Sequence, residues 1–77
     1  MARIVHFRQQ RLDRVSLHDG IDAKFHINDV EGRRILQVWT TGRASREHPG
    51  KVSQTIQLTE ASGRELYDIL KKAFGFK

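Results

Sequence analysis

The spacing of apolar residues changes once along this 77-residue chain, at Thr59. From Val15 to Leu58 apolar and polar residues largely alternate, a pattern typical of strands with one buried face. Beyond Thr59 apolar residues recur every three or four positions, which predicts one amphipathic helix. Its apolar stripe is Leu66, Ile69, Leu70, Ala73 and Phe74. We therefore expect an α+β fold in which a sheet is followed by one C-terminal helix.

The two ends of this helix carry matching signals. Thr59 suits the N-cap, and Glu60 lies in the first turn, where the helix dipole favours an acid. Lys71 and Lys72 lie near the other end, where the dipole favours bases, and Gly75 is a natural stop. The predicted helix therefore occupies residues 59–75.

Turn signals divide the part of the chain before the helix. Asp19-Gly20 predicts a tight hairpin turn, and Glu31-Gly32 predicts a second short reversal. Residues 42–50 hold two glycines and the only proline, so we expect an exposed connection there. The expected strands are residues 15–18, 21–30, 33–41 and 52–58. They predict an antiparallel four-stranded meander, with residues 1–14 as either a further strand or an extended arm.

The length of the chain limits it to one domain, residues 1–77, with the sheet at 15–58 and the helix at 59–75. Domains this short often gain stability from disulfides, metals or partner subunits, and the chain has no cysteine. We therefore predict self-association, as a homodimer.

Net charge and hydropathy limit the classes of partner that the chain can bind. The net charge of +5 favours an anionic partner such as nucleic acid or an acidic protein surface. No apolar run approaches the roughly 20 residues needed to cross a bilayer, and the first residues lack a secretory signal. We predict a cytoplasmic protein with no membrane association.

Alternation divides the expected sheet into two faces. The apolar face, which we expect to meet the helix, consists of Phe25, Ile27, Leu36, Val38, Val52, Ile56 and Leu58. The polar face consists of Lys24, His26, Asn28, Arg33, Ile35, Gln37, Trp39, Thr41, Ser53, Thr55 and Gln57. This second face has no acidic residue, and it holds the only tryptophan of the chain.

Basic residues and an aromatic ring on one open sheet predict a surface for single-stranded nucleic acid. Bases stack on aromatic rings, and cations track the phosphates. The predicted binding residues are Lys24, Arg33, Arg34, Trp39, Arg43, Arg46 and Lys51. Two alternatives stay open: Ile4, Val5 and Phe7 cover Trp39 and Ile35 as a second small core, or the face is a dimer interface.

Catalysis is not expected. The histidines at positions 6, 18, 26 and 48 show no metal-ligand spacing, and no pair of carboxylates is placed to act as acid and base. Ser45, Ser53 and Ser62 lack a nucleophile-elbow context, and the glycines do not form a phosphate-binding loop. We predict no enzymatic activity, no cofactor and no metal.

Phe25 to Phe74 resembles the positive-cofactor-four (p15) family of transcriptional coactivators and their bacterial relatives. The resemblance lies in FHINDVEGRRILQVW, in a charged loop that ends in PGK, and in VSQTIQLTEASGRELYDILKKAF. It implies a four-stranded sheet with a C-terminal helix, a dimer, and binding of single-stranded DNA on the sheet face. The chain departs from the family at Val30 and at Thr41 or Gly42, where members usually have aromatic residues. The repeat of purine-rich-element-binding proteins has the same element order.

The predicted function is binding of single-stranded DNA in transcription, replication or repair. An alternative is a protein-interaction module, such as a small regulator or a phage-encoded inhibitor, that presents its sheet edge or basic face to an acidic protein. Binding of structured RNA is a further alternative.

Overall fold

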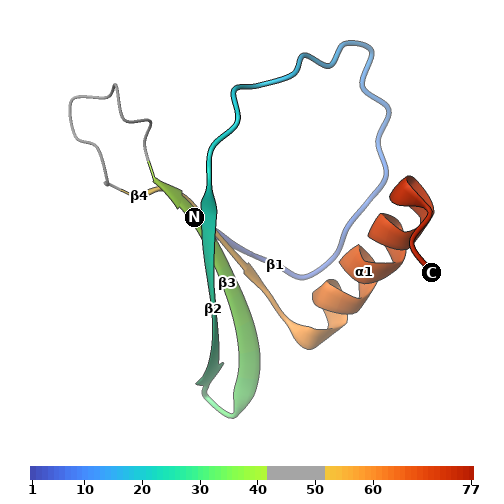
Figure 1. The fold of residues 1–77 in the computed structure, drawn as a ribbon. Helices are drawn as coiled ribbons and strands as arrows, with labels where there is room; N and C mark the ends of the chain where they lie inside the picture. The colour runs from blue at the N-terminus through green and yellow to red at the C-terminus, as the bar shows by residue number, and fades with distance from the viewer. Residues whose placement is uncertain (42–51) are drawn as a thin grey trace.

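The computed structural model describes residues 1–41 and 52–77, with residues 52 and 53 described by their backbone alone. The strands are β1 (Ala2–Ile4), β2 (Ala23–Val30), β3 (Arg33–Thr41) and β4 (Val52–Leu58), and the helix is α1 (Glu60–Phe74). The strands form one sheet in the order β1-β4-β3-β2, and α1 leaves it directly after β4 (Figure 1). The predicted α+β class with four strands and one C-terminal helix is confirmed.

The sheet is mixed, so the prediction of an antiparallel meander is wrong in one respect. β2, β3 and β4 are antiparallel neighbours as expected. β1 joins the outer side of β4 in the parallel direction, with Ala2 opposite Ile56 and Ile4 opposite Leu58. Of the two possibilities left open for residues 1–14, the first residues therefore form a strand.

The predicted hairpin around Asp19-Gly20 is also wrong. Residues 5–22 contain no strand and sweep from β1 to β2 as a wide connection (Figure 1). Ordering each residue costs about 1–2 kcal/mol of backbone entropy. The expected strand 15–18 had only Val15 and Leu17 to bury, and both are exposed. The turn signal at Asp19-Gly20 therefore does not lead to a strand, because too little apolar surface would be buried to offset the entropy cost.

The second predicted reversal, at Glu31-Gly32, is confirmed. Both residues have positive φ, 52° at Glu31 and 77° at Gly32. Two consecutive residues in this region are the hallmark of the tight turns that match the twist of a hairpin. The turn sets β2 against β3 so that Asn28 lies opposite Ile35.

The caps of α1 are those that the sequence predicts. The Thr59 hydroxyl accepts from the Ser62 amide at 3.2 Å, and the Ser62 hydroxyl accepts from the Thr59 amide at 2.9 Å. At the other end Gly75 is left-handed, with φ of 69°, and its amide donates to the Lys71 carbonyl. A reciprocal capping box therefore fixes the start of the helix within one residue of β4.

The expected packing of the helix on the apolar face is largely absent. Leu58 is buried beside the first turn of α1, where Leu36, Thr59 and Gly63 line a hollow of about 310 Å³. Farther along the helix diverges from the strands (Figure 1), and Phe25 on the same face is 68% exposed. Because only one residue links β4 to α1, the direction in which the helix leaves the sheet decides what it can cover.

A clamp holds the N-terminal segment against the helix. The Glu65 carboxylate accepts from the Phe7 backbone amide at 3.0 Å, and its other oxygen lies 3.2 Å from His6 Nδ1. Hydrogen bonding by the Phe7 amide, reinforced by that of His6, lowers the pKa of Glu65 from its ordinary value of 4.5. The segment after β1 is thus tied to the middle of α1.

In the described ranges 1–41 and 52–77, no helix has the length and apolar character needed to cross a membrane.

Candidate functional site

The register of β2 and β3 brings the polar face together around Trp39. Lys24 lies opposite Trp39, and His26 lies opposite Gln37. Side chains of opposite residues point to the same face of a sheet, so a cation and an imidazole flank the indole and the amide. The Trp39 side chain is half-buried, and it therefore has one part anchored in the sheet and another part open to solvent.

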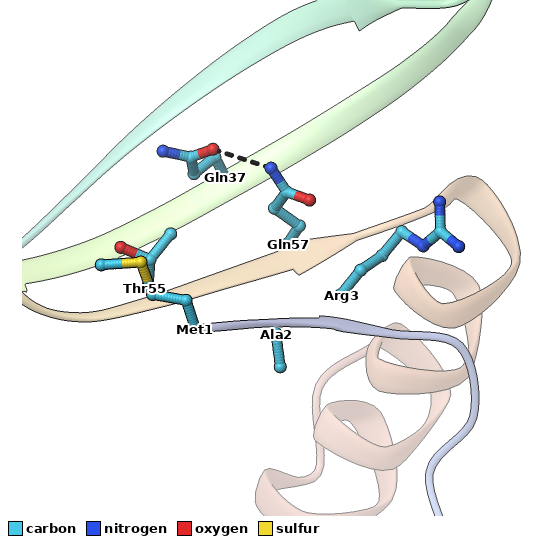
Figure 2. Close-up of a pocket in the computed structure, with 6 residues that line it drawn as sticks. All are labelled: Met1, Ala2, Arg3, Gln37, Thr55 and Gln57. Atoms are coloured by element: carbon cyan, nitrogen blue, oxygen red, sulfur yellow. Dashed lines mark hydrogen bonds between the residues drawn. The ribbon is translucent and has the colours of Figure 1, made fainter.

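The register of β3 and β4 extends the face with neutral polar groups. Trp39 lies opposite Thr55, and Gln37 lies opposite Gln57. The Gln57 side-chain amide donates to the Gln37 side-chain oxygen at 3.0 Å. Within the described part of the chain, the Gln37 amide nitrogen and the Gln57 carbonyl oxygen have no hydrogen-bond partner. The pair therefore presents a free donor at one end and a free acceptor at the other (Figure 2).

Two hollows meet at this glutamine pair. One, of about 220 Å³, is lined by His26, Asn28, Val30, Ile35, Gln37, Trp39 and Gln57. The other, of about 490 Å³, is lined by Met1, Ala2, Arg3, Gln37, Thr55 and Gln57. Ile35 is buried in the floor of the first, so it gives the polar face a small apolar base. Together the hollows run across all four strands of the sheet, from β2 through β3 and β4 to β1.

Arg3 is a member of this site that sequence reasoning missed. It lies opposite Gln57 in the parallel register of β1 and β4. Figure 2 shows its side chain on the same side of the sheet as those of Gln37 and Gln57, while Ala2 points the other way. The signal was present in the alternation of Arg3 with Ala2 and Ile4, but it had meaning only once these residues were known to form a strand.

The structure separates the two adjacent arginines that the sequence grouped together. Arg33 pairs with Val30, which lines the hollow of Trp39, so Arg33 belongs to the polar face. Arg34 points to the apolar face, and its Nε lies 3.3 Å from the Asp29 carboxylate. Of the predicted binding residues, Lys24, Arg33 and Trp39 share one surface and Arg34 does not.

The remaining predicted binding residues fall in or next to residues 42–51, which the structure does not describe. Arg43, Arg46 and Lys51 lie outside the described residues, and so does the side chain of Ser53. At the end of β3 the register shifts between Thr40 and Thr41, with Thr41 opposite Val52. The basic fringe that the sequence predicts beside Trp39 thus stays a prediction.

The N-terminal segment does not cover Trp39. Ile4 lies opposite Leu58, on the other face of the sheet. The Phe7 backbone is bound to Glu65 of the helix, and Val5 is exposed. The alternative in which these three residues bury Trp39 in a second core is therefore wrong, and the described residues that border the hollow beside the indole all belong to the sheet.

The electrostatics of the polar face are one-sided. Among its described residues are the cations Arg3, Lys24 and Arg33, and no acid lies among them. In the same described ranges, no group of three or more His, Cys, Asp or Glu residues is arranged to hold a metal ion. The arrangement suits an anionic ligand that also has flat, hydrogen-bonding parts.

Comparisons of the chain with protein-family models, with curated proteins and with solved structures found no match.

Proposed function

We propose that this protein, as a homodimer, binds single-stranded nucleic acid across its polar face. The observation that carries the proposal is the half-buried Trp39, opposite Lys24, on a sheet surface whose described residues include no acid. A base stacked on an aromatic ring contributes about 1–3 kcal/mol and does so without strong sequence preference. Processes that expose single strands, namely transcription, replication and repair, are the proposed settings.

The residues around Trp39 are expected to bind different parts of the ligand. Lys24 lies on β2 opposite the indole, Arg33 lies at the start of β3, and Arg3 lies at the β1 edge, so cations on both sides of Trp39 are available to the phosphates. The amide pair of Gln37 and Gln57 lies between these edges. The free amide nitrogen of Gln37 and the free carbonyl oxygen of Gln57 can each hydrogen-bond the edge of a base. The strand would therefore cross the sheet, with its bases on the middle strands.

Tryptophan fluorescence tests the proposal directly, because the chain has one tryptophan. Titration with a single-stranded oligonucleotide at low salt should quench the signal, since stacking places a base on the indole. Affinity should fall steeply as salt rises, because phosphate neutralisation releases counterions. Trp39→Leu should weaken binding about 5- to 150-fold, measured by anisotropy of a labelled oligonucleotide.

A matched pair of lysine substitutions distinguishes binding at the polar face from attraction by the net charge of the protein. Lys24→Gln should lower the affinity severalfold, whereas Lys72→Gln, at the exposed C-terminal end of α1, should leave it nearly unchanged. Equal losses in both variants would mean that net charge alone attracts the oligonucleotide. Absence of quenching at low salt would contradict the proposal outright.

A second candidate function, binding of an acidic protein, is favoured by the free edge of the sheet. β2 is one of the two outermost strands, and all eight of its residues are exposed. Such an edge is a template for an added strand of another chain. A protein partner that stays bound to this chain after nuclease treatment and in moderate salt would support this candidate. Structured RNA as the ligand is tested by competition between single-stranded DNA and duplex RNA.

A further inference from the structure

The chain leaves most of its apolar face uncovered. Within the described residues, Ile35 and Leu58 are the buried apolar side chains. On the apolar face Phe25 is 68% exposed, Ile27 is 54% exposed and Ile56 is 40% exposed. These side chains come from β2 and β4, the two strands that flank β3. The exposed apolar surface is therefore continuous across the sheet and not a set of scattered residues.

The apolar stripe of α1 is also largely uncovered. Ile69 is 44% exposed and Phe74 is 69% exposed, although both belong to the stripe that an amphipathic helix normally buries. The Phe74 ring lies beside that of Phe76, with 5.7 Å between the ring centroids. Sheet and helix thus each present an apolar surface that the other does not cover.

The total accessible surface area is larger than that of a compact monomer. The chain exposes 7502 Å², whereas a compact monomer of its mass exposes about 4,800 Å², so the excess is about 2,700 Å². Permanent homodimers bury about 2,000–5,000 Å² in total over both subunits. Residues 5–22, which form no strand or helix, also contribute to this excess, so it is an upper bound on the surface that two copies have available for such an interface.

We propose that the apolar face and the stripe of α1 bind a second copy of this chain, an inference that rests on the homodimer of the proposed function and names its interface. In a two-fold dimer each copy offers the same patch, so the uncovered helix stripe of one copy meets the uncovered strands of the other. The surface must be covered whenever the chain folds, and another copy is the partner that is always present with it. No residue of the polar face takes part, so the interface stands apart from the ligand.

The charges of this face fit a self-interaction. Each chain has a net charge of +5, so two copies repel where their basic surfaces meet. The apolar face has one described acid, Asp29, and it is paired with Arg34 at 3.3 Å. Two such faces approach without net charge between them, and the basic polar faces point away from the junction. An acidic partner protein, in contrast, gains nothing from this side.

The first test uses the unaltered protein without nucleic acid. Sedimentation equilibrium should give twice the mass of one chain. The urea midpoint of unfolding should rise with protein concentration, because dimer formation stabilises only the folded state. A single-chain mass with a concentration-independent midpoint would overturn the proposal, and would mean that residues 5–22 fold back over the face instead. This measurement needs no variant to fold.

The second test compares two adjacent residues of β2. Ile27 belongs to the apolar face and His26 to the polar face, and both are exposed in the single chain. Ile27→Glu should halve the sedimenting mass, whereas His26→Glu should keep the dimer and weaken only oligonucleotide binding. A dimer that withstands Ile27→Glu, or one that His26→Glu dissociates equally, would overturn the assignment of this surface. Loss of oligonucleotide binding with an intact dimer would count against the proposed ligand alone.

Discussion

The Arg34 guanidinium lies 3.3 Å from the Asp29 carboxylate, on the face of the sheet opposite to its neighbour Arg33. Two identical side chains at consecutive positions thus have different surroundings. One is a cation beside the hollow of Trp39, and the other is half of an exposed ion pair. Because both residues are arginines, the same substitution at each position compares the contribution of the two faces to ligand binding.

Arg33→Gln should weaken oligonucleotide binding and reduce the salt dependence of the affinity by about one phosphate contact. Arg34→Gln should leave binding unchanged and lower the free energy of unfolding by roughly 0–1 kcal/mol, the usual range for an exposed pair. Anisotropy titrations at several salt concentrations measure the first, and urea unfolding measures the second. Equal effects of both variants on binding would show that the faces do not differ in their contact with the ligand.

Glu65 makes the N-terminal clamp dependent on pH. The Phe7 amide and, less strongly, His6 lower the pKa of this carboxyl, so the clamp contributes its full stability above 4.5 and loses it as the pH falls through the lowered value. Glu65→Gln should abolish this dependence and speed cleavage within residues 5–22 by an added protease. The pH titration of the Phe7 amide resonance checks the wild-type behaviour.

Glu60→Gln is the control for that experiment, because Glu60 lies on the same helix but makes no contact with the N-terminal segment among the interactions described. It should leave the protease sensitivity of residues 5–22 unchanged at neutral pH. An equal increase in both variants would mean that helix charge, and not the clamp, holds the segment.

The two glycines at positions 32 and 63 should respond to alanine with opposite signs. Gly32 has φ of 77° in the turn between β2 and β3, and a Cβ in this left-handed region costs roughly 1–2 kcal/mol. Gly63 lies inside α1, and an added Cβ there meets no atom within 4 Å. Gly63→Ala should therefore stabilise the protein by up to about 1 kcal/mol. Urea unfolding at one fixed protein concentration gives both values.

The capping box should contribute measurably to stability. Thr59→Ala removes the acceptor of the Ser62 amide and should lower the free energy of unfolding by about 1 kcal/mol. Thr59→Ser keeps the hydroxyl and should cost only a few tenths of this. If both substitutions cost the same, the methyl group of Thr59 matters more than its hydrogen bond. Circular dichroism of the helix during urea titration follows both variants.

The features that the sequence predicted correctly are local. Thr59 and Gly75 end the helix through bonds to residues within four positions, and Glu31-Gly32 turns the chain through its own backbone preference. Alternation likewise placed Trp39 with Gln37 and Gln57, because the period of a strand is fixed. Such signals act over a few residues, so they can be read without knowledge of the rest of the fold.

The features that escaped prediction depend on distant contacts. No local pattern shows that β1 pairs with β4 in the parallel direction, and Arg3 reaches the polar face only through that pairing. The helix stripe predicted an apolar contact for Phe74 without saying with what. The direction of α1 leaves that side chain away from the sheet and 69% exposed.

The pairing of β1 with β4 also limits when the first strand can join the sheet. Strands β2 and β3 are joined by a two-residue turn and can form from neighbouring sequence, whereas Ala2 must wait for Ile56. Closing so long a loop is slow, because its entropy is lost before any contact is gained. During synthesis, β1 therefore has to wait for its partner strand until β4, the last strand in the sequence, has been made.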